Sequence, residues 1–269
     1  MTPENRQSKA IMKLSAAVLF FCTSLIAAVP GFADLSVKPF NEGEKLIFEL
    51  RWTIIPAGEA VLEVLPEKII DGSRAYHFVL TAKSNAFIDS FYKVRDRIDA
   101  FSDIDMTCSL LYKKKQLEGN TNRDVIVKFD REKMLAVYSN KGSTAEPIPI
   151  EKGSFDPLSV FYFSRCLNLE EGSEIVRHVT DGKKGVMGKA KVLRRERIKT
   201  PAGVFDTFVL EPDMKHVGGV FEKSKNARLQ LWVTSDCRHI PVRIKSKVAV
   251  GSFVGELISK EGITDMTCN

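Results

Sequence analysis

The side chains that most often carry catalysis or hold metals are sparse in this sequence and lack the required spacing. The chain has four histidines, which are His77, His178, His216 and His239. They form no His-x-His or His-Glu-x-x-His pattern. There is no Gly-x-Ser-x-Gly elbow, and the glycines between 182 and 188 lack the following helix whose amides would bind phosphate. We therefore expect no catalytic residues, no metal site and no cofactor.

One acidic residue stands out because it interrupts an apolar strand face. Asp96 lies between Val94 and Ile98 at period-two spacing, whereas Asp99 falls on the opposite face of the same strand. The two carboxylates therefore cannot act as an adjacent pair. Asp96 is the candidate for a buried, functional carboxylate. The alternative is a charge on an edge strand that pairs with a neighbouring arginine.

Basic residues are concentrated between 183 and 199. Alternation along a strand predicts that one face carries Lys189, Lys191, Arg195, Arg197 and Lys199, interrupted by Leu193. The first four are candidates for contact with an anionic surface, such as lipid headgroups or a polyanionic glycan. The alternative is a solvated strand face, or an edge strand that lysines protect from pairing.

Four cysteines follow the N-terminal region, an even number that favours disulfides in an exported protein. The candidates are Cys108, Cys166, Cys237 and Cys268, and three pairings are open. No Cys-x-x-Cys pair suggests metal binding. The alternative is that all four are unpaired and partly buried thiols.

Aromatic side chains lie on the stripes that are expected to face the core. Phe48 and Trp52 belong to one strand pattern, and Tyr76 and Phe78 belong to another. A strongly curved antiparallel sheet with an aromatic inner face can enclose an apolar ligand, so these four are candidate ligand-binding residues. The alternative is that they pack the core. His77, between Tyr76 and Phe78, is expected to face solvent.

Period-two alternation of apolar residues dominates the chain after the N-terminal region and predicts strands with one buried face. The first strands fall at 45–52 and from 60 onward, with Pro56-Ala57-Gly58 in the hairpin between them, and a third follows the Asp71-Gly72 turn. Later strands are expected near 94–100, 108–118, 123–129, 133–139, 173–180, 186–199, 204–211, 227–234, 240–249 and 252–259.

One short helix is predicted near 156–166. Asp156 caps it, Pro157 occupies its first turn, and Leu158, Phe161 and Tyr162 recur at helical spacing. The fold class is therefore all-β and mainly antiparallel, either a curved, barrel-like sheet or a β-sandwich. Residues 34–269 are expected to form a single domain, with two similar halves, about 40–150 and 170–260, as a variant suggested by the repeated Pro-Ala-Gly.

Composition and the N-terminus place the protein outside the cytoplasm. With 44% hydrophobic and 28% charged residues the chain is neither disordered nor a multi-span membrane protein. Three basic residues precede an apolar run over 14–29 that is followed by Pro30-Gly31-Phe32-Ala33, which predicts a signal peptide over 1–33. The alternative is an uncleaved membrane anchor, for which the run is short. No second apolar span follows. Cleavage would leave a net charge of only +4 from the +6 of the whole chain, which gives no nucleic-acid signature.

Several short motifs in a fixed order resemble one known family. They are Gly43-Glu44-Lys45-Leu46-Ile47-Phe48, Ala57-Gly58-x-Ala60, Asp156-Pro157-Leu158-Ser159, Thr200-Pro201-Ala202-Gly203-Val204-Phe205, and Leu231-Trp232-Val233-x-x-Asp236 followed by Pro241-Val242-Arg243. Over residues 40–259 the chain is similar to the exported bacterial family catalogued as domain of unknown function 3108. The resemblance implies a periplasmic or envelope-associated β-rich domain, and it implies no activity or catalytic residues.

These observations favour a periplasmic, non-enzymatic β domain that binds or escorts an apolar or amphipathic envelope component, such as a lipid. An alternative is an interaction module that docks on an envelope protein complex through a sheet edge or the basic face. A third is a hydrolase of envelope polymers. Nucleic acid is not expected as a partner.

Overall fold

A computed structural model describes residues 38–213, 228–247 and 252–263. The predicted signal peptide over 1–33, His216 and Cys268 lie outside these ranges. The described residues form mostly β-structure, as expected from the periodicity. They include the predicted helix after Asp156 and a second short helix, over 86–89, that was not predicted.

The elements of the first part of the described chain are β1 (Lys45–Trp52), β2 (Ile55–Ile70), β3 (Ser73–Ser84), α3 (Ala86–Asp89), β4 (Val94–Asp103), β5 (Ser109–Glu118), β6 (Thr121–Asp130), β7 (Leu135–Asn140), β8 (Ser143–Thr144) and β9 (Ile148–Pro149). In this part each strand pairs in antiparallel register with the strand before it, except β9, which pairs with β7. The second part contains α4 (Pro157–Arg165), β10 (Glu174–Thr180), β11 (Gly185–Thr200), β12 (Gly203–Pro212), β13 (Arg228–Thr234), β14 (Pro241–Lys247) and β15 (Ser252–Glu261).

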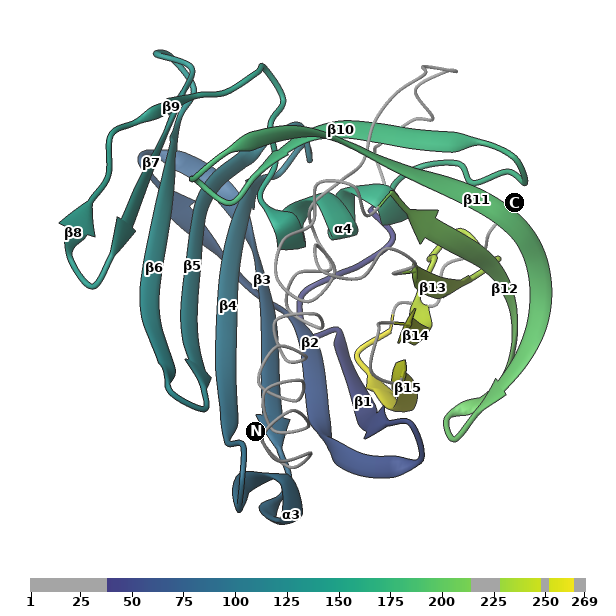
Figure 1. Cartoon of the computed structure of the whole chain (residues 1–269). Coiled ribbons are helices and arrows are strands. Elements are labelled where there is room, and N and C mark those ends of the chain that lie inside the picture. The colour runs from purple at the N-terminus through teal and green to yellow at the C-terminus, as the bar shows by residue number, and fades with distance from the viewer. Residues whose placement is uncertain (1–37, 214–227, 248–251, 264–269) are drawn as a thin grey trace.

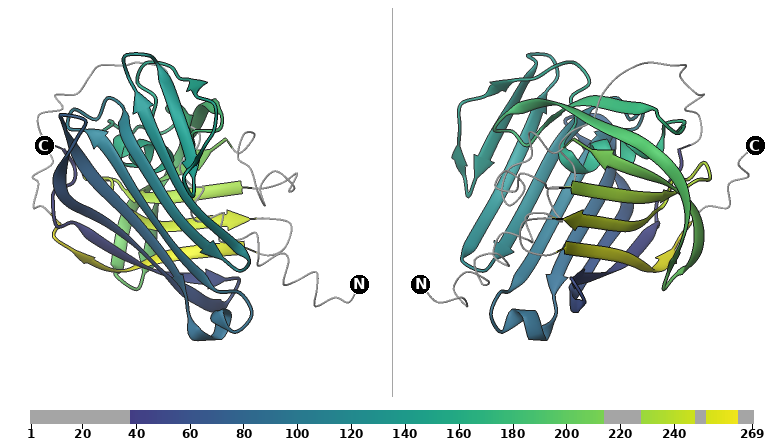
Figure 2. Two further views of the ribbon diagram at one scale, coloured as in Figure 1. Left: turned by 90° about the vertical axis from the view of Figure 1, so that its left-hand side faces the viewer. Right: turned by 45° about the vertical axis from the view of Figure 1, so that its right-hand side comes forward.

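All these strands belong to one sheet, in the order β10-β11-β12-β13-β14-β15-β1-β2-β3-β4-β5-β6-β7-β8, with β9 paired to β7. The two halves of the chain meet where β15 pairs with β1 in antiparallel register. The sheet curls round on itself without closing (Figures 1 and 2). The barrel-like prediction is therefore confirmed.

Alternation decides which side of each strand faces the interior. In β1 the buried side chains are Leu46, Phe48 and Leu50, separated by partly exposed residues. The expected Asp71-Gly72 turn joins β2 to β3, and both residues have positive φ, 47° and 81°. Glycine adopts this conformation without steric cost, so the turn is encoded locally.

The first hairpin differs in detail from its prediction. Its turn lies at Thr53 and Ile54, and Pro56-Ala57-Gly58 belongs to β2, beside a bulge in the β1 pairing. A Cβ atom at Gly58 would lie 2.1 Å from the carbonyl oxygen of Lys83. The glycine therefore serves close approach of two strands rather than a turn.

Helix α4 lies within the curve of the sheet (Figure 1), and all nine of its residues are buried. The predicted cap is present: Asp156 Oδ1 accepts hydrogen bonds from the amides of Leu158 (2.8 Å) and Ser159 (2.9 Å). Ser109 donates to the other carboxylate oxygen at 2.5 Å. The cap thereby also joins the helix to β5.

The C-terminal end of α4 is fixed by a buried ion pair. Arg165 donates to both carboxylate oxygens of Glu44, at 2.5 and 2.9 Å, and both side chains are at most 2% exposed. Its remaining donors reach the carbonyls of Pro39 (3.0 Å) and Arg238 (3.1 Å). One guanidinium thus connects α4 to the segment before β1 and to the turn between β13 and β14.

The β10–β11 hairpin folds back over the other end of the sheet. Phe155 and Val179 form a parallel bridge, and a Cβ at Gly182 would lie 2.7 Å from a methyl group of Val127 on β6. Lys183 lies over the Tyr138 ring of β7 at 4.9 Å. The turn of this hairpin therefore packs on β6 and β7.

Candidate functional site

The interior contains an apolar pocket between the first strands, α4 and the last strands. Its lining residues are Phe48, Leu50, Ala60, Leu62, Leu80, Leu158, Phe161, Leu231, Pro241, Arg243 and Ile244. They come from β1, β2, β3, α4, β13 and β14, which lie far apart in the sequence. The pocket exists because the curved sheet brings both halves of the chain against the same helix.

The chemistry of the pocket is that of a small apolar binding site. Its cavity volume is about 60 Å³. Arg243 contributes the one charged side chain of the lining, and its guanidinium donates to Glu256 at 2.8 Å and to the carbonyl of Lys199 at 2.8 Å. Because that charge is already paired, the lining favours hydrocarbon groups rather than anions.

The four aromatic residues predicted to bind a ligand fall in different places. Phe48 lines the pocket. Phe78 stacks on Tyr162 of α4, with ring centroids 3.9 Å apart, and Tyr76 stacks beside Phe78 at 5.8 Å. Trp52 is partly buried and is not part of the lining. Phe78 and Tyr76 thus contribute to core packing against α4, which was the alternative considered for them.

A polar cluster lies on the same inner face, beyond the pocket. Across the sheet, Ala60 pairs with Ala82, Ala82 with Asp96, and Asp96 with Gln116. Residues paired in antiparallel register share one face. Adjacent strands are about 4.8 Å apart, so Asp96 lies about 10 Å from the pocket residue Ala60.

The members of the cluster are buried although they are polar. Asp96, Gln116 and Glu118 are 4%, 5% and 3% exposed, and Lys114 is 8% exposed. Strand β4 is flanked by β3 and β5, so Asp96 does not lie at an edge. Its carboxylate accepts a hydrogen bond from the amide of Leu117 at 2.8 Å. Asp96 is therefore buried, and the interpretation of this residue as an edge-strand charge paired with an arginine is wrong.

Burial controls the protonation of this cluster. It raises the pKa of Asp96 to about 8, helped by the hydrogen bond and repulsion between its carboxyl group and that of Glu118. The pKa of Lys114 is lowered, because burial disfavours its charged form more than the neighbouring carboxylates favour it. At neutral pH the Asp96 carboxyl group is therefore mainly protonated.

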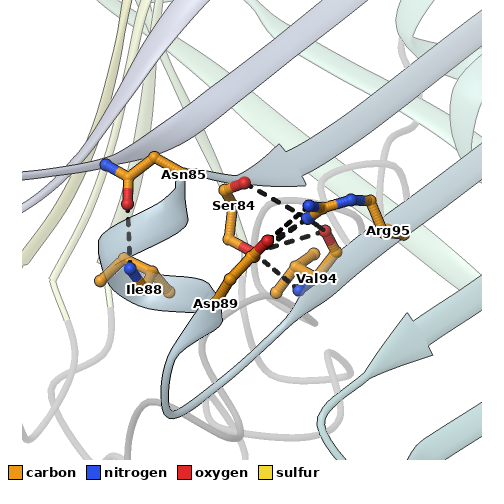
Figure 3. Close-up of polar contacts among 6 residues, drawn as sticks. All are labelled: Ser84, Asn85, Ile88, Asp89, Val94 and Arg95. Carbon is orange, nitrogen blue, oxygen red and sulfur yellow. Dashed lines mark hydrogen bonds and ion pairs between the residues drawn. The ribbon is translucent and has the colours of Figure 1, made fainter.

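The neighbouring end of the inner face is held by the connection from β3 to β4 (Figure 3). Asn85 caps α3 by accepting from the amide of Ile88 at 2.9 Å. Ser84 donates to Asp89, and the amide of Val94 donates to Ser84 at 2.8 Å. Arg95 donates to Asp89 at 2.5 Å. The hydrogen bond from Arg95, followed by that from Ser84, lowers the pKa of Asp89.

Sequence analysis identified Asp96 but missed its partners. The signal was present in the strand predicted over 108–118, where the inner-facing position after Tyr112 is Lys114, followed by Gln116 and Glu118. A strand face that changes from apolar to polar side chains forms a buried polar patch only where another part of the protein covers the polar end. The strand's own sequence does not show whether this end is covered. The residues that α4 and the last strands contribute to the pocket had no such local signal.

The two described histidines nearest to candidate sites have structural partners. His77 is 7% exposed, contacts Asp99 Oδ1 at 2.8 Å and stacks on Phe101, so the prediction that it faces solvent is wrong. The outer face carries a small apolar cluster of its own there, which includes Phe101. His239 is buried in the β13–β14 turn, and burial lowers its pKa. In the described ranges no His, Cys, Asp and Glu side chains are grouped to hold a metal ion.

The basic stripe of β11 is divided between the two faces of the sheet. Val192 pairs with Leu210 and Arg194 with Val209, so Leu193 is the extra residue of a bulge. A bulge reverses the alternation that follows it. The pairing therefore places Lys189 and Lys191 on one face, and Arg195, Arg197 and Lys199 on the other.

The separated basic residues have different surroundings, although all five are exposed. Lys189 lies 4.0 Å from Glu174, and Arg197 lies 3.7 Å from Asp206. The guanidinium of Arg195 lies over the Phe208 ring at 4.5 Å. The expectation of one continuous basic face is wrong. Contact of these residues with an anionic surface stays a prediction.

Two of the four disulfide candidates are free thiols. Cys108 is buried beneath β4 and β5, and Cys166 follows α4 as its C-cap. Burial raises the pKa of Cys108 and raises the pKa of Cys166 to about 11, so both are weakly reactive. The prediction of two disulfides is therefore wrong for these residues. Cys237 is not a free thiol, and a single disulfide that includes it stays a prediction.

One protein family matches this chain over most of its length. The model of DUF3108, a protein family of unknown function, matches residues 47–258. The chain belongs to DUF3108. The resemblance that its motifs suggested is confirmed, and the match runs from within β1 to within β15. No curated protein matches this DUF3108 chain.

Solved structures similar to this DUF3108 chain share its architecture at low sequence identity. A beta-barrel-like protein of the domain of unknown function DUF1849 from Brucella abortus has a TM-score of 0.51 and 12% identity, over 86% of this chain and 100% of that chain. This likeness supports the barrel-like fold.

Two further crystal structures are more distant. A candidate lipoprotein from Parabacteroides distasonis has a TM-score of 0.35 and 12% identity, over 83% of this chain and 97% of that chain. A candidate exported protein with a YmcC-like fold from Bacteroides fragilis has a TM-score of 0.38 and 10% identity, over 83% of this chain and 98% of that chain. Among the described residues of the DUF3108 chain, no helix is long and apolar enough to cross a membrane.

Proposed function

We propose that this protein is a periplasmic, non-enzymatic domain that binds or escorts an apolar or amphipathic envelope component. The observation that carries the proposal is the apolar pocket enclosed by β1 to β3, α4 and the last strands. Ten of its eleven lining residues are apolar, and the eleventh, Arg243, is already paired with Glu256. Such a lining binds hydrocarbon groups in preference to polar or charged groups.

The energetics of the pocket suit a hydrocarbon segment. Each methylene group that leaves water for an apolar site contributes about 0.8 kcal/mol. A free volume of about 60 Å³ holds a few groups of the size of water. A ligand therefore anchors one end or one short segment here, and the rest of the molecule lies along the inner face of the sheet.

Location supports the same function. The predicted signal peptide over 1–33 leads to export, and an exported chain meets lipids and other amphipathic molecules of the envelope. The family match brings no activity with it. A binding role requires none of the catalytic constellations that the sequence lacks.

Native mass spectrometry of the mature chain, purified from its own envelope without detergent, tests the proposal. We expect co-purified lipid or another amphipathic molecule. The variant Ala60→Leu should lose it, because the larger side chain would occupy the pocket. The control Val204→Leu, at a position 55% exposed, should retain it. A ligand-free mass for the parent protein, or equal ligand content in Ala60→Leu, would contradict the proposal.

A second candidate function is docking on an envelope protein, and one surface favours it. Asn85 donates to the carbonyls of Pro56 (2.7 Å) and Ala57 (3.0 Å), which ties the α3 connection to the start of β2. Exposed apolar side chains gather at this end of the sheet: Ile54 (83% exposed), Ile55 (37%), Phe87 (63%) and Phe91 (45%). A stoichiometric protein in the same mass spectra, lost in Phe87→Ser, would support docking rather than transport.

A further inference from the structure

The inner face of the sheet changes from apolar to polar along a short path. Leu62 pairs with Leu80, Leu80 with Ile98, and Ile98 with Lys114. One row further along the strands, towards α3, the sequence of pairs runs from Ala60 through Ala82 and Asp96 to Gln116. On this face the buried polar groups therefore begin two strands away from residues that line the pocket.

Three acceptor atoms in this polar region have no hydrogen-bond donor among the described side chains and amides. They are Asp96 Oδ2, Gln116 Oε1 and Glu118 Oε1. A proton held between the two carboxyl groups would satisfy the first and third, but the amide oxygen of Gln116 would still lack a donor. Gln116 is 5% exposed and lies directly opposite Asp96 in register. Buried acceptors without donors are costly, so they point to a missing donor group.

The charge of the region points to a cation. Asp96 and Glu118 would carry two negative charges if both were ionised, and Lys114 supplies one positive charge. Arg123 and Asp181 also act on Lys114, and their opposite charges offset one another. The cluster is therefore one positive charge short, and without a ligand the proton on Asp96 makes up the difference.

We propose that Asp96, Gln116 and Glu118 form a subsite for the primary ammonium headgroup of an amphipathic ligand whose hydrocarbon end occupies the pocket. This inference rests on the proposed function and specifies its ligand class. An ammonium group supplies three donors and one positive charge, which are what the cluster lacks. A neutral hydroxyl group would supply a donor without charge, and an anionic headgroup would be repelled by the carboxyl pair.

Binding exchanges one cation for another. The Asp96 carboxyl group releases its proton to solvent and becomes a carboxylate, and the ligand enters as an ammonium ion, so the charge of the cluster is unchanged. Because Asp96 is mainly protonated at pH 7, binding at that pH should release about one proton per ligand. No covalent bond to the ligand forms or breaks.

Titration calorimetry with matched amphiphiles tests the subsite. The probes are dodecylamine and N-dodecylacetamide, which share a chain and differ in the charged amine, and ethanolamine as an amine without a chain. We expect dodecylamine to bind at least tenfold more tightly than N-dodecylacetamide, and ethanolamine not to bind. Titrations in two buffers of different ionisation enthalpy should give the release of about one proton for dodecylamine and none for N-dodecylacetamide.

Variants of the two aspartates on β4 locate the effect. Asp96→Asn should abolish the preference for the amine and the proton release while retaining the binding of N-dodecylacetamide. Asp99→Asn is the matched control, because Asp99 belongs to the opposite face and contacts Arg97 and His77. It should behave as the parent protein does. Glu118→Gln provides a second test if Asp96→Asn does not fold.

The outcomes separate the two proposals. Equal binding of the two dodecyl probes, or an amine preference that persists in Asp96→Asn, would overturn the subsite and leave the apolar pocket as the binding site. Tight binding of ethanolamine alone would show a site for free amines and would overturn the amphipathic ligand. If neither dodecyl probe binds, the inference and the proposed function both fail.

Discussion

Replacement of Asp96 by asparagine should change how the stability of this protein depends on pH. In the folded state the pKa of Asp96 is about 8, against 3.8 for a free side chain. Between these values the folded protein holds a proton that the unfolded chain has released. Linkage then requires that stability fall as pH rises, because the unfolded state binds fewer protons. This stability contribution is complete below pH 3.8 and is lost as pH rises through the folded pKa.

The size of the effect follows from the shift. One pKa unit corresponds to about 1.4 kcal/mol, so the free energy of unfolding should decrease by about 3 kcal/mol between pH 5 and pH 7 through this group alone. Over the whole interval from 3.8 to about 8 the loss amounts to about 5 to 6 kcal/mol. Asparagine does not titrate, so Asp96→Asn should lack this slope.

Urea unfolding at pH 5, 6, 7 and 8, followed by the fluorescence of the two tryptophans, measures the difference. The free energy of unfolding of the parent protein minus that of Asp96→Asn should decrease steadily as pH rises. Contributions from other titrating groups, including His239, are common to both proteins and cancel in this difference. Val204→Leu, at an exposed position whose side chain does not titrate, is the control and should show a constant difference across this interval. A pH-independent difference for Asp96→Asn would refute the buried, protonated carboxyl group.

Three further substitutions test packing contacts of the fold, each by urea unfolding. Arg165→Met leaves the Glu44 carboxylate buried without its partner and should cost about 3 to 5 kcal/mol, and a loss below about 1 kcal/mol would contradict this account of the pair. Asp156→Ala removes the acceptor of two helix amides and should cost about 1 to 2 kcal/mol, whereas no loss would show that the cap is dispensable. Gly182→Ala should cost about 2 to 3 kcal/mol through backbone strain and a clash, and Gly142→Ala, with similar φ and open space, should cost about 1 kcal/mol. Equal costs would show that the β10–β11 turn does not pack as described.

The free thiols show how far local sequence reasoning extends. An even number of cysteines in an exported chain favours disulfides, but pairing depends on the distance between Cα atoms in the fold. Cys108 follows β4 in a turn, and Cys166 caps α4. Each has surroundings that bury its sulfur and raise the pKa of the thiol. Count and compartment therefore could not decide their state.

The basic stripe illustrates a second limit. Alternation correctly predicted a strand over 186–199, but one extra residue at Leu193 reverses the face of every side chain after it. Bulges of this kind arise where a strand must bend to follow a curved sheet. The need for the bend comes from the neighbouring strands, so the pattern within β11 does not reveal it.

Local sequence patterns were sufficient to place most of the strands, the capped helix after Asp156 and the Asp71-Gly72 turn. These features depend on residues within a few positions of one another, through alternation, capping and the conformational freedom of glycine. The tertiary structure alone decided which strands meet. It brought Phe48, Phe161 and Leu231 to one pocket and placed Asp96 beside Gln116 and Glu118. The physical reason is that register, curvature and desolvation are set by contacts between segments distant in sequence, and no local pattern encodes these contacts.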